Sequence, residues 1–186
     1  GLYTRVDLEG AGAATASDEE DGSLTPRPVG VERIARLRPG THRITWTVSD
    51  SAGQRARAEQ RIDIRPRVGI GPDRTVEEGS PVEVAVELNG ASIEGSPASV
   101  DYTIAAASTA SAGDHDLPAS GTLTFDEGRS ASLSFRALAD ATAGEGPETL
   151  VIALESASGA VRGERRRATI TLVEANVAPR VSLRAA

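Results

Sequence analysis

The sequence predicts an all-β chain built from two tandem β-sandwich modules. Apolar and polar residues alternate in every apolar run from residue 41 to residue 172, and a helical period of 3.6 residues is almost absent. Clusters of Gly, Pro, Asp and Ser separate these runs, as turns do between short strands. We therefore expect no substantial helix, and a strand content well above the roughly 20–25% of typical globular proteins.

The first group of runs predicts a β-hairpin with one wet and one buried face. In THRITWTV (41–48), Ile44, Trp46 and Val48 share one face, and in RARAEQRIDI (55–64) charged residues alternate with Ala and Ile. The turn-rich segment SDSAGQ lies between the two runs. A helix is an alternative for 55–64, because Ala, Arg, Glu and Gln favour helices. The alternation and the proline that follows favour a strand.

The second group of runs predicts a Greek-key β-sandwich, because about seven short strands over about 100 residues are typical of that architecture. The runs are PVEVAVEL (81–88), SVDYTI (99–104), GTLTF (121–125), SLSF (132–135), TLVIAL (149–154) and RATITL (167–172). The segment RPRVGIGPDR (65–74) is interpreted as a short, stiff and nearly linear linker between the modules. The predicted core residues are Trp46, Val82, Val84, Leu123, Phe125, Phe135, Leu150, Ile152 and Ile170.

Composition narrows the classes of function. The 186 residues include no Cys, which excludes disulfides and thiolate-bound zinc, and no Met, which suggests a piece of a longer chain. No apolar run approaches the roughly 20 residues of a membrane helix, so we expect no membrane insertion. Residues 69–176 carry seven arginines against 17 carboxylates, a net charge of −10, whereas residues 1–68 carry a net charge of +1. The acidic second half argues against a nucleic-acid partner.

The sequence offers no convincing catalytic constellation. Asp114-His115-Asp116, with Ser120 nearby, contains the residue types of a triad, but no Gly-x-Ser-x-Gly elbow or other nucleophile motif accompanies them. His42 precedes the inward-facing Trp46 and is expected to be structural. The basic run GERRRA (163–168) is interpreted as a solvated strand edge whose arginines discourage edge-to-edge pairing. We expect the chain not to be an enzyme.

Particular segments resemble known repeat families. Residues 69–176 resemble a Calx-beta repeat in the order of VEEGSPVEVAVEL, GDHDLPASGTLTF, DEGRSASLSF, LADATAGEGPETLVIAL and ATITLVEAN. Residues 1–66 resemble a bacterial immunoglobulin-like or hyalin-type repeat without its first strand, through ASDEEDGSL, LRPGTHRITWTVSDSAGQ and QRIDIRP. NVAPRVSLRAA (176–186) is similar to the first strand of a polycystic-kidney-disease-like module. The resemblance implies tandem immunoglobulin-like sandwiches at 1–66 and 67–176, followed by the first strand of a further module at 177–186.

The Calx-beta resemblance also implies a set of calcium ligands, because acidic residues at one end of the sandwich surround the ions in calcium-binding members of that family. The matching positions are Glu77, Glu78, Asp114, Asp116, Asp140, Glu145, Glu148 and Glu174. Calcium takes six to eight oxygen ligands, so several loops must contribute. Ala139, Pro147 and the exit sequence EAN depart from the family pattern, which leaves two interpretations open: a weak calcium site, expected at the end facing the first module, or solvated loop tips.

Together these observations favour a non-catalytic structural or adhesive pair of modules in a large bacterial cell-surface or secreted protein. The pair would act as a spacer, with neighbouring repeats as partners and a protein or polysaccharide as a further ligand. The alternative is a carbohydrate- or protein-binding accessory module of a secreted enzyme. Only 3% of residues are aromatic, too few for an exposed row that stacks on sugars, which favours the spacer. The apolar alternation in 179–186 further suggests head-to-tail self-association, in which this strand adds to an open sheet edge of another copy.

Overall fold

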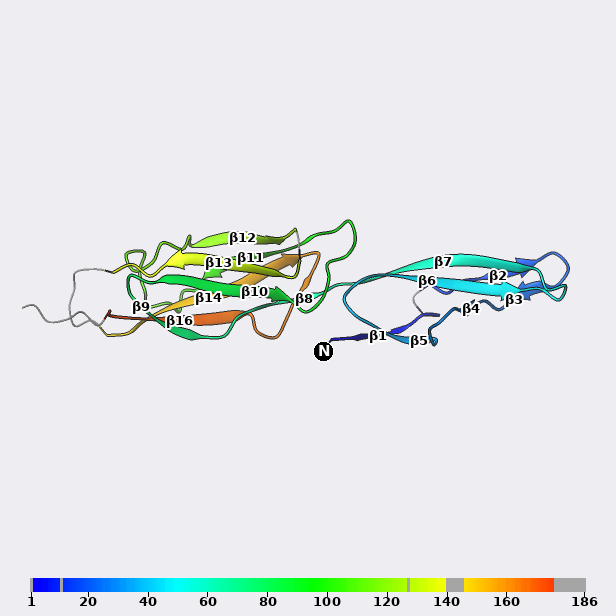
Figure 1. Ribbon diagram of the computed structural model, residues 1–186, viewed down its shortest axis with the longest axis horizontal. Helices are drawn as coiled ribbons and strands as arrows, with labels where there is room; N and C mark the ends of the chain where they lie inside the picture. The colour runs from blue at the N-terminus through cyan, green and yellow to red at the C-terminus, as the bar shows by residue number, and fades with distance from the viewer. Residues whose placement is uncertain (1, 11, 127, 140–145, 176–186) are drawn as a thin grey trace, which may run out of the picture.

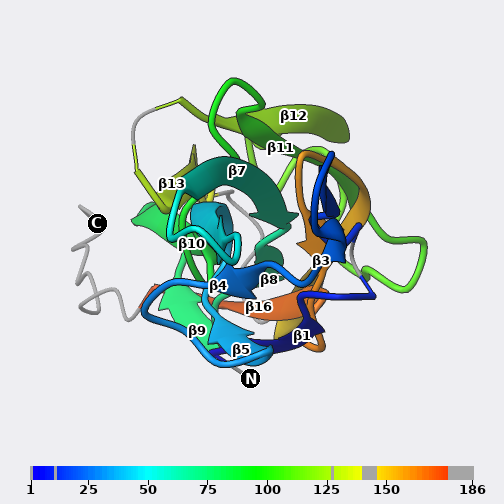
Figure 2. The ribbon, with the colours of Figure 1, turned by 90° about the vertical axis from the view of Figure 1, so that its right-hand side faces the viewer.

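The computed structural model describes residues 2–10, 12–126, 128–139 and 146–175, and over these residues the chain is all-β. It contains 58% strand and no helix, which confirms the predicted fold class. The strands form two layered bodies that lie end to end along the long axis (Figure 1). Seen along that axis, the strands of the N-terminal part lie in front of those of the C-terminal part (Figure 2). We call the described residues up to Ile64 the first module, and residues 67–173 the second.

The first module is built around the predicted hairpin. Its strands are β1 (Thr4–Asp7), β2 (Ala16–Asp18), β3 (Gly22–Leu24), β4 (Arg27–Pro28), β5 (Ile34–Leu37), β6 (Gly40–Ser49) and β7 (Arg55–Ile64). The order β4-β6-β7 forms one sheet, and the pairs β1-β5 and β2-β3 form two further sheets. The hairpin strands match the two predicted runs closely. The small core consists of Leu8, Ala35, Leu37, Ile44, Trp46 and Ile62.

The second module consists of two larger sheets. Its strands are β8 (Arg67–Ile70), β9 (Arg74–Glu77), β10 (Pro81–Leu88), β11 (Ala98–Ile104), β12 (Ser120–Phe125), β13 (Ser130–Arg136), β14 (Glu148–Ser158), β15 (Val161–Arg162) and β16 (Arg167–Val173). The sheet orders are β13-β10-β8-β15 and β12-β11-β14-β16-β9. Neighbouring strands are antiparallel except for β15 with β8 and β16 with β9, which run parallel.

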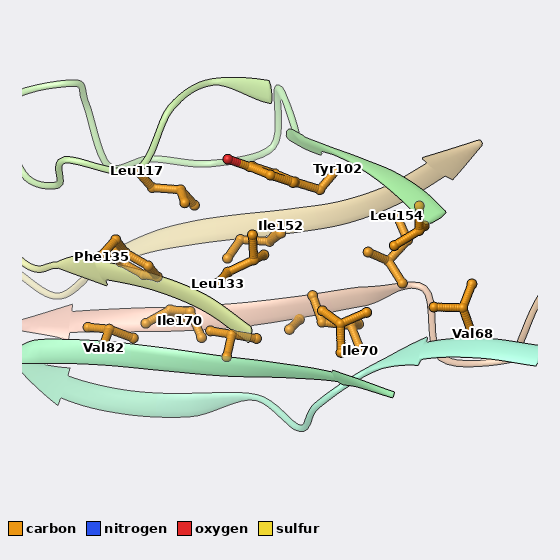
Figure 3. Packing of buried hydrophobic residues seen from close by; sticks show 14 of the residues in the cluster. Val68, Ile70, Val82, Tyr102, Leu117, Leu133, Phe135, Ile152, Leu154 and Ile170 are labelled. Atoms are coloured by element: carbon orange, nitrogen blue, oxygen red, sulfur yellow. The ribbon is translucent and has the colours of Figure 1, made fainter. Parts of the chain in front are cut away.

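The core of the second module lies between these two sheets and is almost free of polar groups (Figure 3). Alternation places one side chain in two on the inner face, as in β10, where every second residue is buried. All the predicted core residues are buried except Leu123, which is only partly covered. Leu123 lies on β12, which is an edge strand and has a neighbour on one side alone.

The predicted linker is shorter than its composition indicated. Within 65–74, β8 already pairs with β10 and β15 as part of the second module, and β9 begins at Arg74. The interpretation of the whole segment as a linker is therefore wrong, and only Arg65 and Pro66 lie between β7 and β8. β8 and β9 are not evident from the sequence, because both strands are short and glycines and a proline interrupt the alternation of side chains around them. None of the described residues forms a helix that could cross a membrane.

Candidate functional site

The loops that carry most of the implied calcium ligands meet at one end of the second module. The Glu78 amide donates to the Val173 carbonyl at 2.9 Å, which joins the β9–β10 turn to the end of β16. The Leu138 amide donates to the Asp114 carbonyl at 2.8 Å, which joins the segment after β13 to the loop before β12. Glu148 begins β14 opposite the end of β16. The backbone thus brings together loops that are far apart in the sequence.

This acidic end lies away from the first module, so the expectation that it faces that module is wrong (Figure 1). At one end of β10, Leu88 pairs with Val68 of β8, next to the connection. At the other end of β10, Pro81 pairs with Arg136, beside the acidic loops. β8, which lies within the predicted linker, and β9 cross the module instead, and so carry Glu77 to the far end.

His115 is a core residue at this end rather than an exposed ligand. Its backbone forms an isolated antiparallel bridge with Ala137, and its side chain is 6% exposed. The ring lies edge-on to Phe135, with centroids 6.4 Å apart and an interplanar angle of 80°. Its Nδ1 atom has no hydrogen-bond partner among the described residues. The side chain therefore packs the loop against the core.

The two aspartates beside His115 fix the backbone of the loop. Asp114 Oδ2 accepts from the Ser111 amide at 2.6 Å, and Asp116 Oδ1 accepts from the Arg136 amide at 2.6 Å. Each aspartate therefore holds a backbone amide of a neighbouring segment in place. The other histidine, His42, donates from Nε2 to the Arg38 carbonyl at 2.8 Å, as expected for a structural role.

Asp114 has the electrostatic environment of a partly buried anion. Desolvation by burial raises the pKa of its carboxyl group, but hydrogen bonds from the Ser111 amide and side chain lower it. The neighbouring Glu148 carboxyl group and the charge of His115 lower it further, so the pKa of Asp114 lies below its ordinary value. Two carboxyl groups in such proximity share a proton or attract a cation, because two negative charges at that distance repel each other.

The remaining implied ligands are scattered around this pair. Glu78 is half-buried, and Glu77, Asp116 and Glu174 are exposed. Asp140 and Glu145 lie outside the described residues. Among the residues that the structure describes, no three Asp, Glu or His side chains come close enough together to hold a metal ion. Calcium binding at this end therefore stays a prediction that rests on Asp114, Glu148 and the residues around them.

A second polar cluster, which the sequence analysis missed, joins the two modules. Arg43 Nη2 donates to Glu94 Oε2 at 2.7 Å, and Arg61 Nη2 donates to the Glu94 carbonyl at 2.8 Å. The Glu94 amide donates to Thr41 Oγ1 at 3.0 Å, and that hydroxyl donates to Asp63 Oδ1 at 2.7 Å. We call these five residues the inter-module clamp. Four of them come from β6 and β7, which place Arg43 opposite Arg61 and Thr41 opposite Asp63, so one face of the hairpin base meets one loop of the second module.

The clamp is exposed, which limits the energy of each contact. Arg43 and Glu94 are 53% and 61% exposed, and pairs of that kind contribute about 0–1 kcal/mol each. The Thr41 hydroxyl lowers the pKa of Asp63 by its hydrogen bond, burial opposes this effect, and Arg61 and Arg43 lower the pKa further. Asp63 therefore remains charged at neutral pH and holds Thr41 and Arg61 in position.

Hydrogen bonds within the second module fix the connection and β8 beside the clamp. Asn89 Oδ1 accepts from the Arg67 amide at 2.7 Å, and the Asn89 amide donates to the Arg67 carbonyl at 2.9 Å. The connecting Pro66 is buried, and its carbonyl accepts from the Val161 amide at 2.9 Å. A Cβ atom at Gly90 would lie 2.7 Å from Pro39 of the first module, so a larger residue there would force the modules apart. The joint is a packed contact as well as a short connection.

The outer side of the first module has an open sheet edge. Among the described strands, β7 pairs with β6 alone, and its residues Ala56 and Ala58 are exposed. A hollow of about 490 Å³ runs beside them, with Trp46 and Val48 in its lining. An added strand could pair with this edge, although the proposed donor strand at 177–186 lies outside the described residues.

Comparison with known proteins gives no independent assignment. No family model matches the chain, and no curated protein matches it.

Proposed function

We propose that this chain is a pair of non-catalytic β-sandwich modules that acts as a spacer in a large bacterial cell-surface or secreted protein. The observation that carries the proposal is the inter-module joint. Two residues connect β7 to β8, and the clamp and the close approach of Gly90 to Pro39 cross the same boundary. A spacer has to keep the domains at its two ends a fixed distance apart. A short connection with lateral contacts limits bending better than a long flexible linker does.

The free energy that holds the two modules in line is small, but it is enough to keep most molecules aligned. Each exposed polar contact contributes about 0–1 kcal/mol, so the three that cross the boundary together favour the aligned state by up to about 3 kcal/mol. At about 2–3 kcal/mol, a bent state is restricted to about 0.6–3% of the molecules. The modules would thus remain aligned most of the time without an extensive apolar interface, which suits an extended chain of repeats.

The acidic end of the second module adds weak calcium binding to the proposed function. A calcium ion bound near Asp114 and Glu148 would relieve the repulsion between neighbouring carboxylates, with affinity in the roughly 10⁻⁴–10⁻³ M range of extracellular modules. Because this end lies away from the first module, the ion would stabilise the loops there rather than the joint between the two modules. Calcium dependence and stiffness of the joint are therefore separable properties.

Small-angle X-ray scattering of the full chain tests the proposal. A single compact domain of 186 residues has a radius of gyration of about 16 Å, and two modules held end to end should give about 20 Å or more. The expected result is an elongated particle whose dimensions do not change between low and high salt, since packing and backbone contacts support the joint. A compact particle, or a broad distribution of dimensions, would contradict the spacer function.

A further inference from the structure

A hollow of about 620 Å³ lies on the second module where β14, β15 and β16 meet. The side chains of Arg162, Arg165, Arg166 and Arg167 line it, with the buried Ala153 and Leu154 among its other walls. We call this cavity, with its four arginines, the arginine hollow. Its volume falls within the roughly 300–1,000 Å³ typical of ligand sites.

The charge of this hollow contrasts with that of the rest of the module. Four of the seven arginines of residues 69–176 line it, although that segment carries a net charge of −10. Within the described part of the chain, none of these four arginines forms an ion pair. The lining also contains the carboxylates of Asp73, Glu155 and Glu164, which leave it a net charge of +1. Asp73 accepts from the Thr169 amide at 2.9 Å, and Glu155 accepts from the Thr103 hydroxyl at 3.2 Å.

The backbone that carries the arginines is fixed at nearly every residue. The Arg166 carbonyl accepts from the Leu154 amide at 2.7 Å, and the Arg165 carbonyl accepts from the Ile70 amide at 3.2 Å. Arg167 pairs with Ala153 across β14 and β16, and Arg162 pairs with Val68 across β15 and β8. These hydrogen bonds hold the loop in one conformation, so a ligand would not have to order it, which favours binding.

Together these features indicate an anion as the ligand. The guanidinium group presents parallel N–H donors that match a sulfate or carboxylate group in a bidentate manner. No aromatic side chain lines the hollow, so it lacks the stacking surfaces with which proteins hold single-stranded nucleic acids. The negative charge elsewhere on the module also repels a densely charged polymer. A polysaccharide that carries sulfate or carboxylate groups at intervals fits both conditions.

We propose that the arginine hollow binds an acidic polysaccharide through its sulfate or carboxylate groups. The site gives the second module a ligand of its own, and it is independent of the spacer function, because it involves none of the clamp residues. It also replaces the interpretation of the run GERRRA as a solvated strand edge with a specific role for its arginines.

The test uses the full chain and calorimetric titration with three polymers of similar size: dextran sulfate, polygalacturonate and neutral dextran. The variant Arg165→Gln/Arg166→Gln removes two charges from the hollow, and Arg55→Gln/Arg57→Gln removes two exposed charges from β7 as a matched control. Dextran sulfate or polygalacturonate should bind, neutral dextran should not, and the hollow variant should bind at least about tenfold more weakly. The control should change the dissociation constant by less than about twofold. Higher salt should weaken the binding, because ions screen exposed charges.

Several outcomes would overturn the proposal. Equal losses in the two double variants would reduce the binding to non-specific charge, and no binding of either acidic polymer at low salt would eliminate the site. Tighter binding of single-stranded DNA, with the same sensitivity to Arg165→Gln/Arg166→Gln, would assign the hollow to nucleic acid instead. A thermal melt of each variant checks that it folds, and since glutamine replaces exposed side chains, the midpoint should stay within a few degrees of the parent.

Discussion

Truncation of Phe135 to alanine should destabilise the second module and leave the first one nearly unchanged. Phe135 is 7% exposed, packs edge-on against His115 and lies opposite Val82 in the core between the two sheets. A buried aromatic side chain removes about 150–250 Å² from water, and its loss also leaves a cavity. Measured Phe→Ala costs in cores are about 3–5 kcal/mol. Since β13 is an edge strand that can relax towards the cavity, we expect about 3–4 kcal/mol.

The chain offers a built-in assay for this prediction. Trp46 is the only tryptophan and is 3% exposed in the core of the first module, so its fluorescence follows that module alone. Circular dichroism in the far ultraviolet follows the strands of both modules. In urea, Phe135→Ala should shift the transition that circular dichroism assigns to the second module, while the transition in Trp46 fluorescence moves little. Phe135→Leu provides the conservative comparison and should cost less than about 1.5 kcal/mol.

Two results would refute this reasoning, each at a different step. A cost below about 1 kcal/mol would show that Phe135 does not face the core. An equal shift in Trp46 fluorescence would show that the two clusters of buried residues unfold as one cooperative unit.

Three further predictions concern the acidic end, a buried strand and the C-terminal segment. About 2 mM calcium should stabilise the chain by about 0.6–1.8 kcal/mol if the dissociation constant lies between 10⁻³ and 10⁻⁴ M. Asp114→Asn should abolish the shift in a thermal melt, and no calcium-specific shift relative to magnesium in the parent would leave the acids as loop-tip charges. Asp101 accepts hydrogen bonds from Ser156 and Thr122, which lower its pKa below 3.8, so its stabilising effect exists above about pH 4 and is lost as the pH falls through the lowered value. The stability difference between the parent and Asp101→Asn in urea should therefore be largest near pH 7 and shrink below pH 4, and a difference independent of pH would contradict this. Finally, removal of residues 177–186 should abolish any concentration-dependent rise in mass in light scattering, and equal monomer masses for both chains at high concentration would exclude head-to-tail association.

The sequence predicted the long strands well because alternation is a local property. β10 and the hairpin strands β6 and β7 each carry enough inward-facing apolar residues to define a face without knowledge of their partners. β1, β5, β8 and β9 have four residues each, and β15 has two. Such short strands are defined by their backbone hydrogen bonds to neighbouring strands, and their few side chains do not show a clear alternation. The linker was therefore predicted too long.

For the candidate sites too, local features could be predicted from the sequence, whereas features that depend on the packing of distant segments could not. Glu78, Asp114 and Glu148, which the resemblance to calcium-binding repeats implies as ligands, lie at one end of the second module, but the direction of that end depends on β8 and β9. The hairpin was predicted, and in the structure its register places Thr41 opposite Asp63 and Arg43 opposite Arg61, which supplies four of the five clamp residues. Glu94 could not be found, because it lies in an irregular loop and meets the hairpin only through the relative placement of the two modules.

The rigidity of the joint is the central claim, and distances between two spin labels measure it directly. The chain has no cysteine, so Glu59→Cys/Glu83→Cys would label one exposed site on β7 and one on β10 without other substitutions. Pulsed dipolar spectroscopy should give one narrow distance distribution for the parent. Arg43→Ala/Arg61→Ala should broaden it by releasing both arginine contacts to Glu94, whereas Arg55→Ala/Arg57→Ala, on the same strand away from the clamp, should not. A broad distribution in the parent, or one that neither pair of substitutions changes, would contradict the account.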